Sequence, residues 1–194
     1  MVLRIIGGEF GGRVLKSAKG PRTRPLLGQV REAIFNVLGD RVSGALVWDL
    51  FAGTGASGLE ALSRGASRVI FVEKANQALA VLRANLDLLG EAVRERADIV
   101  RADAWSPPPL TPRGEERETP PDLVFVDPPY AMVSEDPSRA VHRVMGIFER
   151  LAPGGRLVFH FLEGQLDRDD FDADLDVDLR AWGSSAVAIL GAGD

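Results

Sequence analysis

A glycine-rich loop follows an apolar segment near the start of the second quarter of the chain. Residues 46–52 are apolar except for Asp49, and three glycines with the spacing G-x-G-x-x-G follow from Gly53 to Gly58. The next residues, 59–64, favour a helix. A strand that passes through a glycine turn into a helix is typical of a nucleotide-cofactor loop, because glycines let the backbone turn sharply and approach a ligand closely. A tight structural turn can have the same spacing, so other motifs must decide.

The segments around this loop alternate between strand and helix patterns. Strands are expected over 45–50, 68–73, 99–100, 122–127, 156–161 and 186–190, and helices over 56–64, 75–89 and 138–151. This alternation predicts a parallel sheet with helices on both faces and a ligand site at the carboxyl ends of the strands. Residues 105–121 contain six of the twelve prolines and predict a loop, and the acidic run 167–178 predicts a solvated loop that leads into a strand.

The first 31 residues differ in charge from the rest of the chain. They contain seven basic residues and one acidic residue, a formal charge of +6, whereas the whole chain carries −5, so the remainder carries −11. Residues 2–6 and 13–16 predict two strands of a hairpin, and a helix is expected from about Leu27 to Gly39. A basic arm on an acidic body indicates a face that binds a polyanion, although a solvated basic loop has the same composition.

The composition argues against metal and membrane sites. The chain contains no cysteine and two histidines, His142 and His160, which are too few for a convincing metal cluster. It has no apolar run long enough to span a membrane, and its N-terminus lacks a secretory pattern. We therefore expect a cytoplasmic monomer that binds no metal.

Two further carboxylates follow predicted strands. Glu73 ends the second strand twenty residues after Gly53, where a carboxylate can accept hydrogen bonds from a ribose diol. Asp103 and Ala104 follow the third strand and could bind an adenine edge, although a loop-capping Asp is an equally good explanation. The predicted cofactor-binding residues are Asp49, Phe51, Ala52, Gly53, Thr54, Gly55, Glu73, Lys74, Asp103 and Ala104.

The tetrapeptide Asp127-Pro128-Pro129-Tyr130 ends the fourth strand. Two prolines stiffen the backbone and remove two N–H donors. The Asp127 carboxylate and the Pro128 carbonyl then form a pair of acceptors that suits an amine on a planar base, and the Tyr130 ring offers a stacking surface. We predict that these four residues are catalytic, against the alternative of a plain strand-ending turn.

Several motifs together point to one family. They are Arg4-Ile5-Ile6-Gly7-Gly8, Gly12-Arg13, Arg24-Pro25, Val30-Arg31-Glu32-Ala33-Ile34-Phe35-Asn36, Asp49-Leu50-Phe51-Ala52-Gly53-Thr54-Gly55, Gly58-Leu59-Glu60-Ala61-Leu62-Ser63-Arg64-Gly65-Ala66 and Asp127-Pro128-Pro129-Tyr130. In these motifs the chain resembles the RsmD-type family of class I S-adenosylmethionine-dependent methyltransferases, over residues 4 to about 161. The chain departs from the family's usual pattern at Leu26 and Leu27, and at His160, where the family often has Glu.

The resemblance implies an α/β fold with a Rossmann-like seven-stranded sheet, helices on both faces and a small N-terminal β-hairpin. It implies an extension over 1–25 and a methyltransferase domain over 26–194. The implied reaction is S-adenosylmethionine-dependent methylation of the N2 amine of a guanine in small-subunit ribosomal RNA, within assembly particles. Phosphate contacts are then expected from Arg4, Arg13, Arg22, Arg24 and Arg31.

Other functions stay open at this point. A nicotinamide-dependent dehydrogenase would use the same glycine loop and Glu73, although Asp49 and the Asp-Pro-Pro-Tyr motif disfavour it. A non-catalytic RNA-binding relative would keep the fold without the activity. A divergent N-methyltransferase would act on another nucleobase, such as DNA adenine, or on a protein glutamine amide.

Overall fold

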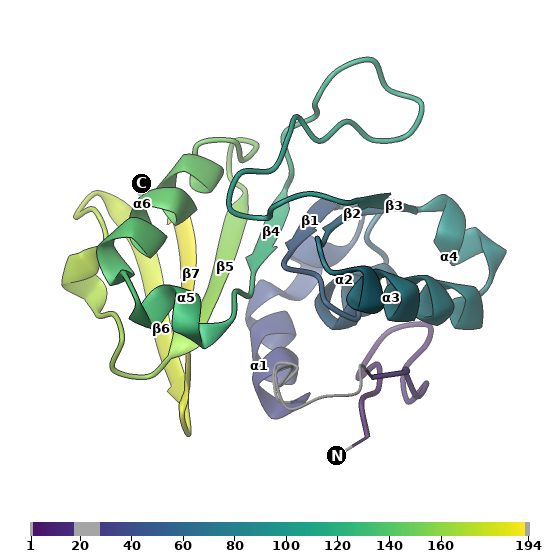
Figure 1. Cartoon of the computed structure of the whole chain (residues 1–194), viewed down its shortest axis with the longest axis horizontal. Coiled ribbons are helices and arrows are strands. Elements are labelled where there is room, and N and C mark those ends of the chain that lie inside the picture. Colours follow the sequence, from purple (N-terminus) through teal and green to yellow (C-terminus); the bar gives the residue numbers. More distant parts are fainter. Residues whose placement is uncertain (1, 18–27, 193–194) are drawn as a thin grey trace.

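The structure, a computed structural model, describes residues 2–17 and 28–192. A seven-stranded sheet with the order β3-β2-β1-β4-β5-β7-β6 forms its centre (Figure 1). The strands are β1 Leu46–Leu50, β2 Arg68–Val72, β3 Ala97–Val100, β4 Leu123–Val126, β5 Arg156–Leu162, β6 Leu175–Trp182 and β7 Ser185–Ala192. The helices are α1 Gly28–Leu38, α2 Ala56–Ser63, α3 Asn76–Leu89, α4 Glu91–Glu95, α5 Tyr130–Ser134 and α6 Pro137–Phe148, with short 3₁₀ helices η1 Gly39–Val42 and η2 Arg168–Asp170.

Five strands of the sheet are parallel, as the alternating pattern predicts. Strand β1 pairs with β2 and β4, β2 with β3, and β4 with β5, all in parallel. Strand β7 runs antiparallel to both β5 and β6. The exception follows from the connection: β6 and β7 are separated by only two residues, and Gly183 there has a φ of 62°, so the chain reverses in a tight hairpin.

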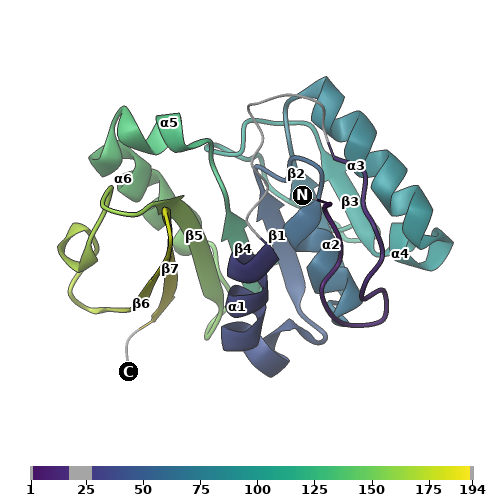
Figure 2. The ribbon, with the colours of Figure 1, turned by 90° about the horizontal axis from the view of Figure 1, so that it is seen from below.

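Alternate residues of the central strands point to opposite faces, and each face carries its own apolar cluster. Val47 packs with residues of α1, α2 and α3, whereas its neighbour Trp48 packs with residues of α5 and α6. The two layers of helices are seen on either side of the sheet in Figure 2. The Rossmann-like fold with helices on both faces is confirmed.

The proline-rich segment between β3 and β4 forms the predicted loop, which projects from the sheet in Figure 1. Arg150 holds it, because its guanidinium donates to the carbonyls of Pro107 and Pro108 and pairs with Glu118 at 3.0 Å. The same guanidinium lies over the ring of Trp48, 4.5 Å from its centroid. The loop is therefore attached to the face of the sheet that carries Trp48 and is covered by α5 and α6.

The N-terminal hairpin differs from its prediction. The chain reverses as expected, but continuous strands do not form over 2–6 and 13–16. The two segments share an isolated antiparallel bridge between Arg4 and Val14, with backbone hydrogen bonds from Leu15 N–H to Leu3 O and from Ile5 N–H to Arg13 O. The next part of the hairpin bonds to α2 instead. The N–H groups of Ile6 and Gly7 both donate to the buried carboxylate of Glu60, at 2.7 and 2.8 Å.

The close fit of this hairpin against α2 explains its glycines. A Cβ on Gly8, whose φ is +76°, would lie 2.0 Å from the carbonyl oxygen of Ser63. The hydroxyl of Ser63 donates to Gly7 O and accepts from the N–H of Phe10. The N–H of Glu9 also donates to the backbone carbonyl of Ser63 at 2.8 Å, so the hairpin supplies a partner for a carbonyl at the C-terminal end of α2.

Candidate functional site

The carboxyl ends of five neighbouring strands bring most of the predicted site residues to one edge of the sheet. The glycine loop follows β1, Glu73 follows β2, Asp103 lies beyond β3, and Asp127 follows β4. The fifth strand, β5, adds His160 to this edge, a residue that the sequence did not assign to the site. A parallel sheet places its ligand site at this edge, so the arrangement fits the prediction.

The glycine loop adopts a backbone that few other residues tolerate. Phe51, Gly53 and Gly55 have φ values of 60°, 55° and 85°. A Cβ on Gly55 would lie 2.3 Å from Leu82 Cδ1, whereas a Cβ on Gly53 would meet nothing nearer than Phe51 O at 3.8 Å. Gly55 is therefore required for packing against α3, and the backbone at Gly53 is open on its Cβ side.

Asp49 lies in β1 beneath this loop and is 2 % exposed. One of its carboxylate oxygens accepts a hydrogen bond from the N–H of Gly58 at 2.9 Å, which fixes the start of α2. Burial raises the pKa of Asp49 to about 8, with smaller contributions from the charges of Asp127 and Glu73, while the bond from Gly58 acts in the opposite direction. Burial therefore favours the protonated form of Asp49 more strongly than that of an exposed carboxyl.

Glu73 joins the glycine loop to the start of α3. Its carboxylate accepts from the N–H groups of Gly53 at 3.0 Å, Lys74 at 2.8 Å and Ala75 at 2.7 Å. The side chain is only partly buried, so the carboxylate also borders solvent at the carboxyl edge. It has the position and the acceptor chemistry that a ribose diol requires.

Lys74 and Asp103 lie near each other beside Glu73. The Lys74 ammonium is 3.8 Å from the Asp103 carboxylate, and both side chains are more than half exposed. Asp103 also accepts from the N–H of Trp105 at 3.1 Å, as in a loop-capping turn, and Ala104 is buried. The rings of Phe51 and Trp105 meet edge to face at 4.9 Å, which joins the glycine loop to the segment after β3.

The Asp-Pro-Pro-Tyr motif runs from the end of β4 into α5. Pro128 is buried, Pro129 is exposed and precedes α5, and Tyr130 is its first residue. The Asp127 carboxylate lies 2.7 Å from Nδ1 of His160, and the Tyr130 hydroxyl lies 3.2 Å from Nε2 of the same ring. The motif is therefore attached to β5 through one buried imidazole.

The pairing register explains this contact and could have revealed it from the sequence. Val126 pairs with Phe159 in the parallel ladder of β4 and β5, so the next positions, Asp127 and His160, are neighbours. The apolar runs 123–126 and 156–159 are the visible signal for that pairing. Ser185, whose hydroxyl is 3.3 Å from the Tyr130 hydroxyl, has no such signal because it comes from the β6–β7 hairpin.

The predicted RNA-binding arginines fall into three groups. Arg4 and Arg13 are exposed on the N-terminal hairpin, where a phosphate can reach them. Arg22 and Arg24 lie outside the described residues. Arg31 departs from the prediction: it is 2 % exposed, donates to the carbonyl of Arg4 and lies near Glu60. A buried guanidinium cannot contact an RNA phosphate at the surface, so Arg31 is not one of the RNA-binding arginines.

Asn85 links the hairpin to the glycine loop and was not predicted. This fully buried amide of α3 accepts from the N–H of Lys16 at 2.7 Å and donates to the carbonyls of Lys16 and Thr54 at 3.0 and 2.9 Å. The segment that presents Arg4 and Arg13 is thus fixed relative to the predicted cofactor loop.

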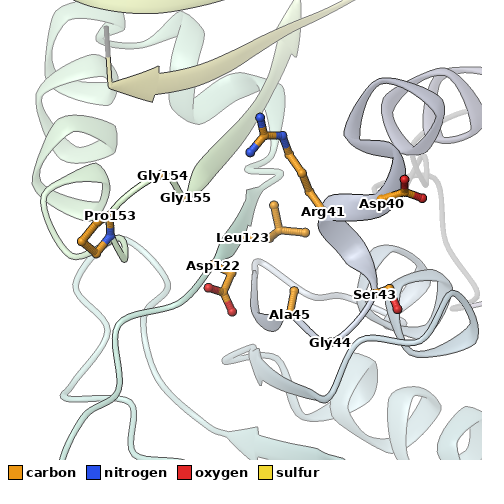
Figure 3. Close-up of a pocket in the computed structure, with 10 residues that line it drawn as sticks. All are labelled: Asp40, Arg41, Ser43, Gly44, Ala45, Asp122, Leu123, Pro153, Gly154 and Gly155. Carbon is orange, nitrogen blue, oxygen red and sulfur yellow. The ribbon is translucent and has the colours of Figure 1, made fainter. Parts of the chain in front are cut away.

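A pocket of about 340 Å³ lies at the opposite edge of the sheet. Figure 3 shows its lining residues, which are Asp40, Arg41, Ser43, Gly44, Ala45, Asp122, Leu123, Pro153, Gly154 and Gly155. They come from η1 and from the amino ends of β1, β4 and β5, so this pocket is not part of the carboxyl edge. Among residues 2–17 and 28–192, no cluster of acidic and histidine side chains is placed to hold a metal, and no helix is long and apolar enough to cross a membrane.

The strand order, the glycine loop and the acceptors at the carboxyl edge define a class I S-adenosylmethionine-dependent methyltransferase. The chain belongs to the family described as conserved hypothetical protein 95, whose model matches residues 3–159. This confirms the RsmD-type resemblance and excludes the dehydrogenase alternative.

Relatives of known name agree with this assignment. The chain is 35% identical over 156 residues to the YlbH protein of Bacillus subtilis, a match that covers 80% of each chain. It is 40% identical over 128 residues to "Ribosomal RNA small subunit methyltransferase D" of Escherichia coli K12, a match that covers 66% of this chain and 60% of that protein. Among solved structures, the YhhF protein of Escherichia coli superimposes with a TM-score of 0.77 at 28% identity, covering 100% of this chain and 99% of that one.

Proposed function

We propose that this enzyme transfers a methyl group from S-adenosylmethionine to the N2 amine of a guanine in small-subunit ribosomal RNA. One observation carries the proposal: Asp127 and Pro128 place a carboxylate and a carbonyl at the end of β4, in the strand next to the glycine loop. The name of the Escherichia coli relative, a small-subunit ribosomal RNA methyltransferase, supports RNA as the substrate.

The residues at the carboxyl edge suit S-adenosylmethionine. The open backbone at Gly53 allows close approach, the partly exposed Glu73 carboxylate can accept from the ribose hydroxyls, and Asp103 with Lys74 borders the place of the base. When bound, this cofactor supplies a methyl group that is already activated by a sulfonium, so the protein needs neither a covalent intermediate nor a metal. The task left to the protein is to hold a nitrogen in line with that methyl group and to exclude water.

The Asp127 side chain and the Pro128 carbonyl can hold the nitrogen of an amine in place. A guanine exocyclic amine is a poor nucleophile because its lone pair is delocalised into the ring. Hydrogen bonds from both N–H groups to Asp127 and to the Pro128 carbonyl hold the nitrogen and favour a more tetrahedral geometry. As the new N–C bond forms, one of these protons leaves, and Asp127 is the acceptor already in contact with it.

Binding of RNA would use the basic N-terminal hairpin, which packs against the C-terminal ends of α2 and α3. Arg4 and Arg13, with Arg22 and Arg24 from outside the described residues, supply charges for backbone phosphates. The target guanine must be unpaired or extruded to enter the site, where Tyr130 can stack on it. A partly assembled small subunit presents such bases, and we propose it as the natural partner.

The decisive experiment compares ribosomal RNA nucleosides from cells with and without the gene by mass spectrometry. We expect one N2-methylguanosine in small-subunit RNA to disappear and to return with the wild-type gene but not with Asp127→Ala. Loss of a methyladenine instead, or methylation of DNA or of a protein glutamine, would replace this substrate assignment. No change in any of these would favour a non-catalytic RNA-binding role.

A further inference from the structure

We propose that His160 is a positioning residue for the methyl-transfer reaction: its Nδ1–H holds one oxygen of the Asp127 carboxylate, so that the other oxygen is presented to the target amine. This inference rests on the proposed function of Asp127 as the amine acceptor. It adds a role for a residue that does not touch the substrate.

The first support is the geometry of the pair. Nδ1 of His160 lies 2.7 Å from Oδ1 of Asp127, a distance typical of a strong hydrogen bond to a charged acceptor. The His160 side chain is 3% exposed, whereas that of Asp127 is 29% exposed. The bonded oxygen is therefore turned into the protein, and the exposed part of the side chain is what remains for a ligand.

The second support is the partner on the other ring nitrogen. An ionised carboxylate only accepts hydrogen bonds, so the contact with Asp127 requires a proton on Nδ1 of His160. In a neutral ring of this kind Nε2 carries a lone pair that can accept from the Tyr130 hydroxyl, 3.2 Å away, and that hydroxyl oxygen can accept from Ser185 at 3.3 Å. With this tautomer the donors from Ser185 to Asp127 can all point the same way, so every group in the chain of hydrogen bonds has a partner.

The third support is that Asp127 lies just beyond the end of a strand, whereas His160 lies within one. Asp127 is the first residue beyond β4, and its N–H donates to Leu50 O at a long 3.4 Å. His160, by contrast, lies inside β5, which is paired on both sides by β4 and β7. The rigid strand therefore fixes the carboxylate through the imidazole, as a supporting shell fixes a catalytic group.

Substitutions at His160 separate positioning from simple packing. His160→Asn keeps a donor where Nδ1 lies, whereas His160→Gln moves the amide one bond further, towards the place of Nε2. His160→Leu removes both contacts and keeps most of the volume. The exposed His142 on α6 gives the matched control His142→Leu, and thermal unfolding with S-adenosylhomocysteine binding shows which variants are folded.

The expected result is a loss in kcat without a loss in binding. His160→Leu and His160→Gln should lower kcat for RNA methylation by about 100-fold, the effect of a misplaced reacting group, with KM for RNA and cofactor affinity unchanged. His160→Asn should recover most of this loss, and His142→Leu should match the wild type. If folded His160→Gln and His160→Asn have equal kcat, or if His160→Leu keeps wild-type kcat, the proposal is wrong.

A second measurement does not depend on methylation. Because the chain contains two histidines, the ¹⁵N signals of the two imidazoles can be assigned by comparison with His142→Leu. We expect a proton on Nδ1 of His160, and a change in the His160 signals in Asp127→Ala. An Nδ1 without a proton would overturn the positioning role. An inactive wild type with the expected tautomer would instead contradict the proposed substrate and leave the Asp127–His160 contact established.

Discussion

Asp127 and His160 face each other across β4 and β5, with 2.7 Å between Oδ1 and Nδ1, although they are 33 residues apart in the chain. This contact joins the motif that carries the proposed chemistry to a buried strand. Two groups of residues lie at the carboxyl edge. Those near β1 and β2 suit the cofactor, and those near β4 and β5 suit the target amine. Mutations on the two sides should therefore have different kinetic effects.

Asp127→Ala should abolish turnover and leave cofactor binding intact. The variant lacks the acceptor for the target amine, and loss of such a group lowers a rate by about 100- to 10,000-fold. Single-turnover methylation of small-subunit RNA measures the rate, and calorimetry with S-adenosylhomocysteine measures the affinity. Asp87→Ala, at an exposed position of α3, is the control. Wild-type single-turnover rates in Asp127→Ala would refute its role.

Glu73→Ala should weaken cofactor binding. The substitution removes the acceptor proposed for the ribose and also releases the N–H of Gly53, and loss of a charge-assisted hydrogen bond costs about 1.5–3 kcal/mol. Calorimetric titration with S-adenosylhomocysteine gives the affinity, with the exposed Glu95→Ala of α4 as control. An unchanged affinity would remove Glu73 from the cofactor site.

Asp49 should make the ligand-free protein less stable as the pH rises. Its pKa of about 8 in the folded protein lies above that of an unfolded Asp, so the unfolded chain releases this proton first. The contribution of Asp49 to the free energy of unfolding is therefore largest below about pH 4 and falls as the pH rises towards 8, by up to about 1.4 kcal/mol per pH unit. Urea unfolding of wild type and Asp49→Asn across this range should show that the substitution removes the decline. Equal pH dependence in both proteins would contradict the raised pKa.

Replacing Arg4 and Arg13 together by Ala should weaken RNA binding most at low salt. Each lost phosphate contact lowers the slope of log affinity against log salt by about 0.7–0.9. Filter binding of small-subunit RNA over a salt series measures this slope, and Arg180→Ala on β6 is the control from the far end of the sheet. A wild-type slope in the double variant would place the RNA-binding face elsewhere.

Glu60→Ala should be strongly destabilising. The fully buried carboxylate accepts from the N–H groups of Ile6 and Gly7 and pairs with Arg64 at 2.8 Å. Removing it leaves buried donors without an acceptor, for which a loss of about 3–5 kcal/mol is typical. Denaturant unfolding compares this variant with Glu95→Ala, and a loss no larger than that of the control would mean that the hairpin does not depend on Glu60 for its stability.

The sequence predicted the central part of the fold because its signals are local. The glycine spacing after β1, the apolar runs of β2, β4 and β5, and the leucine stripe of α3 each depend on residues close in the chain. The short helices α4 and α5 were missed because five residues carry too little periodicity. The β6–β7 hairpin made one strand antiparallel, which the alternation of strands and helices cannot reveal.

The misjudged residues are those whose surroundings come from distant segments. Arg31 has the composition of a phosphate ligand, but α1 turns it towards Glu60, which is 29 residues further along. In the sequence His160 stands out only as a departure from the family pattern, because its partners come from the residue after β4, from α5 and from β7. Asn85 has no signal in the sequence beyond a polar position in a predicted helix, because its three bonds depend on how the hairpin meets α3. Such roles depend on tertiary packing.

The hydrogen bonds between the N-terminal hairpin and the sheet domain limit how this segment can change during evolution. Glu60, Ser63 and Asn85 bond to backbone groups of the hairpin, so they constrain its path and leave most of its side chains free to vary. Exposed positions such as Arg4, Val14 and Lys16 can be exchanged without breaking these bonds. A hairpin transplanted from a relative would pack in the same place only where the recipient protein has the same three acceptors. Substitutions on the outer surface of the hairpin leave these bonds intact, so they would change its proposed RNA contacts one residue at a time.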